Sequence, residues 1–416
     1  MRYAVMGTTV EKVRDVGGSD VKEAPRAGII FATLTREQVD RLRALGCQVS
    51  EVGKVKAPVM PPRPIEAFPT YTPYQFSVAL GYEDLRTITT PPVFGSGYNL
   101  AIIDTGIRES HEHVKGRVVY SKNFTASPMR DGFSHGTAVA SIALVAAPQC
   151  NILNLKVLDD KGVGSEEEVA LAIDDCIRLH DTQSAMAPSI INLSLGSPDD
   201  GNPYNPIRLA CRAAIDRDIW VFAAAGNDSL PGTIMSPACE RYVVAIGSMS
   251  YDPFIVSTFS SRGPTKEGLI KPEMVLFGQD LAVAGSGSDT EIVGKSGTSF
   301  STPVASGMAV LLREAIDRAA ARAFPGYPEP GEALGLSWQT LIDDYMPRVC
   351  LKPQGVPAGK DNDYGWGLPF GAFIRQVLSP AGIAGIDLTA ILSPLSTILV
   401  MGFLGIIIGT ISDVVK

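Results

Sequence analysis

The stretch Asn99-Leu-Ala-Ile-Ile-Asp104-Thr-Gly106 decides the fold, because an apolar strand ends there on a carboxylate and runs directly into a glycine turn. Similar apolar runs recur at residues 152–157, 190–193, 220–224 and 243–246. Candidate helices lie between them at residues 135–146, 166–180, 205–217 and 299–322. Buried strands that alternate with helices predict an α/β fold of three layers, with a doubly wound, mainly parallel sheet covered on both faces.

Two further stretches carry candidate chemistry. Ser134-His135-Gly136-Thr137-Ala138 places a histidine at the start of a helix of small residues. Gly297-Thr298-Ser299 places a serine at the start of another helix, where first-turn backbone N–H groups lack intrahelical partners and can donate to an oxyanion. Asp104 ends its strand at the edge of the sheet where open α/β folds bind ligands. Each signal is weak alone, because strand-terminal aspartates and buried structural histidines are common.

In the order Asp, His, Ser, these three stretches together resemble the subtilisin-like serine proteases, the subtilases of peptidase family S8. The resemblance covers about residues 75–378 and implies a subtilisin-like fold and a serine endopeptidase that works through an acyl-enzyme. It implies Asp104, His135 and Ser299 as the catalytic residues. His135 would take the proton of Ser299, and Asp104 would hold the imidazole in the required tautomer. The alternative is a catalytically silent subtilase-fold protein that binds peptides or serves as a scaffold, assembling through its C-terminal helix.

The same resemblance assigns an oxyanion hole and a peptide-binding cleft. Asn227 would supply the side-chain donor of the hole, beside the backbone amide of Ser299. The stretches implied to bind substrate are Gly162-Val163-Gly164, Ser194-Leu195-Gly196 and Ala223-Ala224-Ala225-Gly226. Two of these would clamp an extended peptide by strand addition. Asp228 and Met235 would border the first specificity pocket and indicate an apolar or mixed preference.

Residues 1–56 predict a small α+β unit. Strands are expected at 3–6, 28–33 and 47–52, and a helix at 36–45 begins with Thr35 and Gln38 in a capping-box pattern. Residues 57–74 form a proline-rich linker. The unit resembles, in architecture only, the inhibitory propeptides of subtilases, whose C-terminal end lies in the active site. This implies the N-terminal segment as an inhibitor and a self-cleavage within residues 55–70.

The C-terminal tail, residues 379–416, contains an uncharged apolar run from 388 to 412. Such a run exceeds the ~20 residues that cross a membrane as a helix, so it predicts a transmembrane helix. A buried core or oligomer helix is the alternative. No secretory signal is recognisable at the N-terminus. The sequence therefore predicts membrane association through a C-terminal anchor, with the catalytic domain in the cytoplasm.

Composition limits the partners. The chain has 416 residues, with 36 Lys and Arg against 44 Asp and Glu, and a net charge of −8 argues against nucleic acid as partner. The partner that the resemblance implies is a polypeptide substrate. The 6 cysteines contain no CxxC pair, which argues against zinc ribbons and thioredoxin-like chemistry. No cofactor is required and no metal ligand is assigned, because His111-Glu112-His113 lacks a third ligand. Calcium as a structural ion stays open, since the acidic residues at 159–160 and 166–168 fit either an ion or a solvated loop.

Overall fold

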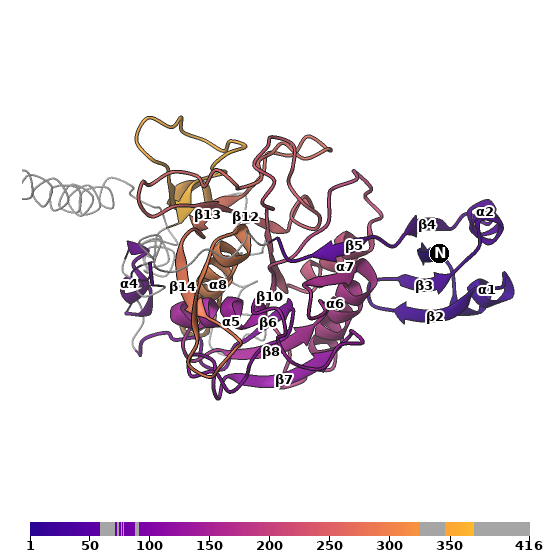
Figure 1. Ribbon diagram of the computed structural model, residues 1–416, viewed down its shortest axis with the longest axis horizontal. Helices are drawn as coiled ribbons and strands as arrows, with labels where there is room; N and C mark the ends of the chain where they lie inside the picture. Colours follow the sequence, from indigo (N-terminus) through magenta and orange to yellow (C-terminus); the bar gives the residue numbers. More distant parts are fainter. Residues whose placement is uncertain are drawn as a thin grey trace, which may run out of the picture.

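The computed structural model describes residues 1–58, 71–72, 75, 77, 79–87, 91–323 and 346–369. Figure 1 shows a large body joined to a small N-terminal unit by the segment that contains β5 (Lys54–Lys56). The predicted tail at 379–416, with its span at 388–412, lies outside the described residues. Within those described ranges, no helix is long and apolar enough to cross a membrane.

The N-terminal unit is a four-stranded antiparallel sheet with two helices. The strands lie in the order β2-β3-β1-β4. The elements are β1 (Arg2–Met6), α1 (Val10–Asp15), β2 (Ser19–Ala24), β3 (Ile29–Thr33), α2 (Arg36–Ala44) and β4 (Gln48–Glu51). The capping box of α2 forms as expected, with Gln38 N–H donating to Thr35 Oγ1 at 3.3 Å. One face of the sheet packs on α1 and α2, and the other joins the apolar cluster of the main body.

Seven strands form the central sheet of the main body, and every neighbouring pair is parallel. Their order is β13-β12-β11-β10-β6-β8-β7. The strands are β6 (Asn99–Asp104), β7 (Val118–Asn123), β8 (Asn151–Lys156), β10 (Ile190–Leu193), β11 (Trp220–Ala224), β12 (Val244–Met249) and β13 (Met274–Phe277). The predicted parallel α/β sheet is therefore confirmed, with five of its strands at the expected positions.

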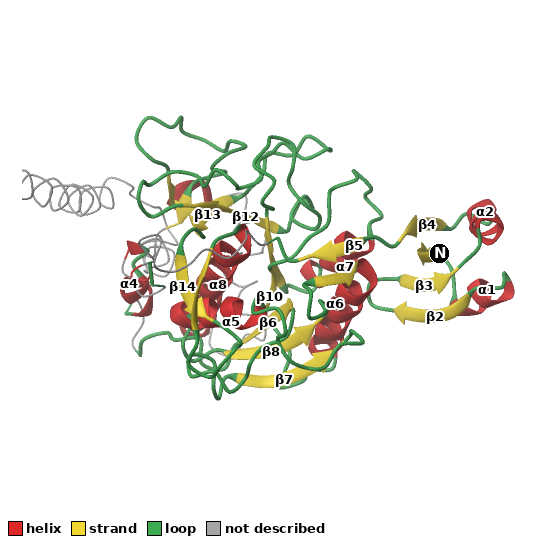
Figure 2. Ribbon diagram, in the orientation of Figure 1, coloured by secondary structure: helices red, strands yellow, loops and turns green. Residues whose placement is uncertain are grey.

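Helices cover both faces of this sheet (Figure 2). They are α5 (Gly136–Ala146), α6 (Glu166–Asp181), α7 (Pro206–Ile215) and α8 (Thr298–Ala323). Along β6, Leu100 and Ile102 belong to the apolar cluster of α5 and α8, whereas Ala101 and Ile103 belong to that of α6 and α7. Because alternate strand residues point to opposite faces, this division gives the predicted three layers.

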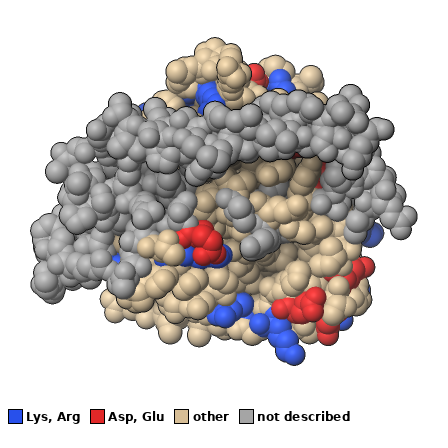
Figure 3. All heavy atoms as spheres, turned by 90° about the vertical axis from the view of Figure 1, so that its left-hand side faces the viewer, with Lys and Arg blue, Asp and Glu red and all other residues tan. Residues whose placement is uncertain are grey.

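Shorter elements surround the main layers. They are α4 (Tyr82–Arg86), β9 (Val163–Ser165), β14 (Leu281–Ala284), β15 (Ile292–Lys295), α11 (Met346–Val349), β16 (Cys350–Leu351) and β17 (Leu368–Pro369). The face at the end of the molecule away from the N-terminal unit carries few charged side chains where the structure describes it, and these are of both signs (Figure 3). This visible face therefore offers no basic patch for nucleic acid.

Candidate active site

Asp104 and His135 meet at the carboxyl edge of the central sheet. Asp104 is the last residue of β6, and His135 is the N-cap of α5. His135 Nδ1 lies 2.7 Å from Asp104 Oδ1, and both side chains are almost fully buried. A Cβ on Gly136 would lie 2.2 Å from Gly106 O, so only glycine lets this helix start approach the strand end so closely. The arrangement fixes Nδ1–H toward the carboxylate and leaves Nε2 for chemistry.

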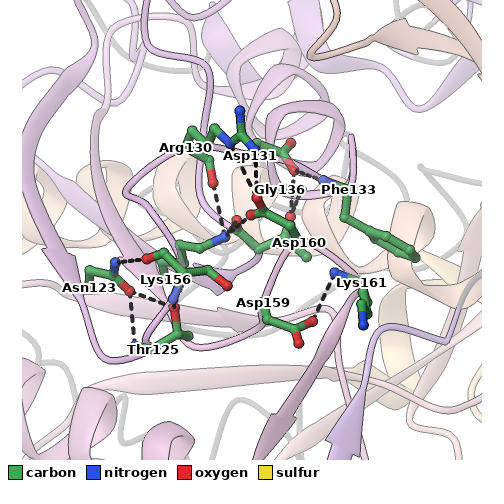
Figure 4. Close-up of polar contacts among 12 residues, drawn as sticks. Asn123, Thr125, Arg130, Asp131, Phe133, Gly136, Lys156, Asp159, Asp160 and Lys161 are labelled. Atoms are coloured by element: carbon green, nitrogen blue, oxygen red, sulfur yellow. Dashed lines mark hydrogen bonds and ion pairs between the residues drawn. The ribbon is translucent and has the colours of Figure 1, made fainter.

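Asp131 binds the loop that leads to His135, and its carboxylate accepts from the Phe133 amide at 3.2 Å (Figure 4). The sequence motifs did not point to this residue. Its carboxylate accepts from Thr105 Oγ1 at 2.8 Å, from Thr137 Oγ1 at 2.7 Å and from the His135 amide at 3.3 Å. Thr105 follows Asp104, so one buried carboxylate connects the strand end to the helix start. The one feature of the sequence that could have pointed to Asp131 is its place four residues before His135.

Lys156, the last residue of β8, binds the backbone of the same two loops (Figure 4). Its buried amine donates to Thr105 O at 2.6 Å and Arg130 O at 2.9 Å, and it pairs with Asp160 Oδ1 at 3.2 Å. Arg130 and then Lys156 hold the pKa of Asp160 below its ordinary value. These contacts fix the backbone on which Asp104 and Asp131 sit.

Ser299 is the second residue of α8, and the next residue, Phe300, packs against the His135 ring at a centroid distance of 5.2 Å. Ser299 Oγ donates to Ser194 O at 3.2 Å and to Pro58 O at 3.3 Å. Among the described residues, His135 Nε2 has no hydrogen-bond partner. Ser299 is buried, but the chain's own Pro58 contributes to its cover.

Asn227 follows β11 and points its amide group at the same carbonyl. Its Nδ2 donates to Pro58 O. The Thr298 backbone N–H and Thr298 Oγ1 both donate to Asn227 Oδ1, at 3.0 and 2.9 Å. Because Oδ1 is occupied by donors, the amide flip is fixed and the NH₂ faces the cleft.

The segment that ends at Pro58 lies in the cleft as an extended strand. β5 pairs antiparallel with β9, with Val55 opposite Gly164 and Lys56 opposite Val163. On the other side, Lys56 N–H donates to Gly196 O and Gly196 N–H donates to Lys56 O, each at 3.0 Å. Ala57 N–H donates to Gly162 O at 3.2 Å. The two predicted peptide-binding edges thus hold three residues of the chain itself, Val55–Ala57.

The remaining predicted cleft residues lie in the sheet or close to it. Ala223 and Ala224 are buried in β11, and Ala225 continues it with N–H donating to Ile246 O at 3.0 Å. Leu195 is buried between Ser194 and Gly196. Their role in substrate binding stays a prediction. Ala57 and Pro58, expected as the start of an exposed linker, are hydrogen-bonded here instead, because the cleft supplies partners to an extended chain.

The acidic residues considered for calcium have protein partners. Glu166 accepts from Gly53 N–H at 2.8 Å, Glu167 pairs with Lys22 at 3.0 Å, and Glu168 completes a capping box with Ser165. Asp159 accepts from the Lys161 amide at 2.8 Å. In the part of the chain that the structure describes, no group of three His, Cys, Asp or Glu side chains is placed to hold a metal ion. His111 Nε2 lies 3.0 Å from Glu291 O, a structural contact.

Comparison with known proteins agrees with this geometry. Residues 95–367 match the model of the Subtilase family, and the chain therefore belongs to that family. It is 28% identical over 254 residues to "Serine protease AprX" of Bacillus subtilis (strain 168), covering 52% of this chain and 57% of that protein. It is 32% identical over 241 residues to "Subtilisin-like protease SBT6.1" of Arabidopsis thaliana, covering 54% and 22%.

A solved structure with the same fold is that of "Sphericase". The TM-score is 0.54 at 25% sequence identity, covering 67% of this chain and 92% of that chain. The chain spans 57% and 22% of the two curated relatives named above, so it aligns with only part of each.

Proposed function

We propose that this chain is a serine endopeptidase in which Ser299 attacks a peptide carbonyl seated where Pro58 O lies. The observation that carries the proposal is this carbonyl, held by Asn227 Nδ2 and 3.3 Å from Ser299 Oγ. An acceptor held there would develop negative charge during attack. Donors aimed at that position stabilise the transition state more than the substrate.

Each step of acyl transfer has a residue to perform it. His135 Nε2 takes the proton of Ser299 Oγ as that oxygen bonds to the carbonyl carbon, and Asp104 stabilises the imidazolium through Nδ1–H. Asn227 Nδ2 and the Ser299 N–H at the helix start hold the oxyanion. The imidazolium then returns the proton to the leaving amine, and water hydrolyses the acyl-enzyme by the same route.

The Ser299 hydroxyl has to turn before it can react. Its present acceptors are carbonyl oxygens, whereas His135 Nε2 has no partner among the described residues. A rotation about χ1 that brings Oγ to Nε2 supplies the base, and such contacts commonly tighten only in the reacting complex. This misalignment also favours a second candidate function, a silent peptide-binding subtilase in which the cleft holds a segment without cutting it.

We further propose that residues 1–58 act as an intramolecular inhibitor that is released by self-cleavage after Pro58. Support comes from the seated segment and from ion pairs and hydrogen bonds of the N-terminal unit with α6. Arg2 Nη2 donates to Glu167 Oε1 at 2.8 Å, and the Arg26 amide donates to Asp174 Oδ1 at 2.7 Å. A strand that blocks the cleft and a unit docked beside it would together exclude other peptides.

Incubation of the purified full chain tests both proposals. Wild type is expected to yield a fragment that begins at Val59, identified by intact mass and N-terminal sequencing, whereas Ser299→Ala stays at full length. Ser288→Ala, which alters an exposed loop serine, is the matched control and is expected to cut like wild type. Full-length wild type after prolonged incubation would contradict self-cleavage and favour the silent function.

A further inference from the structure

The residue before the proposed cut lies between two backbone walls, and the register of the seated strand identifies them. Lys56 and Gly196 exchange both of their backbone hydrogen bonds. In an antiparallel ladder the next such pair is two residues along each strand, which places Pro58 opposite Ser194. Asn227, whose amide binds Pro58 O, continues the other wall from Gly226. The side chain at position 58 therefore enters the space bounded by residues 194–196 and 225–227.

Met235 occupies the space between these walls. A methyl group placed on the Cα of Gly226 would lie 2.7 Å from Met235 Cγ and 2.9 Å from Met235 Sδ. One placed on Gly196 would lie 3.0 Å from Met235 Cβ and 3.3 Å from Met235 Cε. The methionine thus contacts both walls along its whole length, and it is only partly exposed.

The backbone of Met235 is fixed in this place. Its N–H donates to Ala225 O at 2.9 Å, which ties it to one wall. The next residue, Ser236, exchanges backbone hydrogen bonds with Ser197 at 2.8 and 3.0 Å, which ties it to the other. The side chain of Met235 therefore starts from a rigid base between the two walls.

We infer that Met235 restricts the residue before the scissile bond to compact side chains such as proline and alanine and excludes large aromatic ones. This inference rests on the proposed endopeptidase function and deepens it by naming the substrate class. The seated Pro58 agrees with it, because its ring is compact and half-buried. Proline also lacks the N–H that the ladder would direct at Ser194 O, an acceptor that Ser299 Oγ uses instead.

The test varies position 58 and position 235 together in the full chain. Pro58→Ala and Pro58→Phe are each made in wild type, in Met235→Ala and in the matched control Met186→Ala, which shortens a methionine of similar exposure away from the cleft. The two substitutions at 58 carry the same backbone N–H, so they differ only in side-chain size. The rate of cleavage after residue 58 is followed by intact mass.

In the wild-type and Met186→Ala backgrounds, both of which keep Met235, the Pro58→Phe chain is expected to cut at least ~10-fold more slowly than the Pro58→Ala chain. This is the discrimination that a few excess carbon atoms in a closed pocket produce. With Met235→Ala, the two rates should agree within about threefold, because the removed side chain leaves room for the ring. Equal rates in the wild-type background would overturn the inference and show that the flexible methionine moves aside.

The failure of the inference can be told from the failure of the proposed function. All chains are also treated with a fluorophosphonate probe. If the chains are labelled at Ser299 but none of them is cleaved after residue 58, the inference is contradicted, because the seated segment is then not a substrate. Chains that neither cut nor react contradict the endopeptidase function itself.

Discussion

At the scale of single residues, hydrogen bonds to one side of a polar group fix the direction of its other side. Asn227 can direct its NH₂ at the cleft because Thr298 supplies two donors to its oxygen. His135 is oriented because Asp104 binds Nδ1 and Asp131 binds the loop behind it. The motifs predicted Asp104, His135, Ser299 and Asn227 through their resemblance to a family. Asp131 was missed because its role appears only when distant backbone donors converge on it.

Removing the oxyanion donor should lower turnover without preventing cleavage. Asn227→Ala is expected to reduce the rate of self-cleavage about 10²–10³-fold, the range typical of losing one such donor, for which a subtilisin is the reference case. Intact mass over time measures the rate. Because the Thr298 donors also lose their acceptor, thermal unfolding is measured in parallel. A folded variant that cuts at the wild-type rate would show that Asn227 does not bind the developing charge.

Asp131→Ala should lower the rate by misplacing His135. A displacement of about 1 Å in a catalytic group can cost ~10²-fold, and buried donors left unpaired also destabilise the fold by ~1–3 kcal/mol each. The measurement is the self-cleavage rate together with the melting temperature. Loss of stability with an unchanged rate would assign Asp131 a purely structural role.

At the scale of elements, prediction succeeded where the apolar pattern was strong. β6 and β10 are buried throughout and lie close to their expected bounds. β2 and β7 were missed because most of their residues are at least partly exposed, so pairing with a neighbour rather than burial defines them. β5 was missed for a related reason. Its three residues become a strand only by pairing with β9, which lies more than a hundred residues away.

The seated strand supplies an element-scale prediction. Lys56→Pro removes the N–H that binds Gly196 O and should loosen the segment, whereas Lys56→Ala keeps that N–H. A lost hydrogen bond of about 1 kcal/mol should raise the rate of fluorophosphonate labelling roughly fivefold. The rate is compared in freshly purified chains. Equal labelling of the two variants would mean that the ladder does not block the cleft.

At the scale of the whole molecule, the N-terminal unit and the main body meet through the shared apolar cluster and through charged groups around it. Burial would raise the pKa of Glu167, but Arg2 and Lys22 outweigh it and hold this pKa below its usual 4.5. Burial raises the pKa of Asp174 despite its bonds to the Arg26 and Ala27 amides. The sequence predicted the unit from its local pattern. Its docking on the main body could not be predicted, because the sequence does not show which distant charged residue each charged side chain pairs with.

The lowered pKa gives a pH dependence with a defined sign. The Glu167 contribution to docking is fully present above pH 4.5 and is lost as pH falls through the lowered value. In a Ser299→Ala background, hydrogen-exchange protection of Val55–Ala57 should therefore stay constant down to pH 4.5 and fall below it, more in the parent chain than with Glu167→Gln added. Glu37→Gln, on the exposed face of α2, is the control. Identical pH slopes with and without Glu167→Gln would remove this ion pair from the account.

The predicted anchor is tested at the same scale. Residues 388–412 lie outside the described residues, and the prediction rests on their lack of charge. Full-length chain is expected in the membrane fraction and to require detergent for release, whereas a chain that ends before Leu388 stays in the supernatant. Recovery of both chains without detergent would contradict the anchor.

The most direct test of the central claim is the site at which a fluorophosphonate probe reacts. The claim is that Ser299 is a nucleophile activated by His135. Peptide mapping of the labelled Lys56→Pro chain is expected to find the label on Ser299, and adding His135→Ala should slow labelling at least ~100-fold because the base is gone. Labelling at the same rate without His135, or on a residue other than Ser299, would contradict the account.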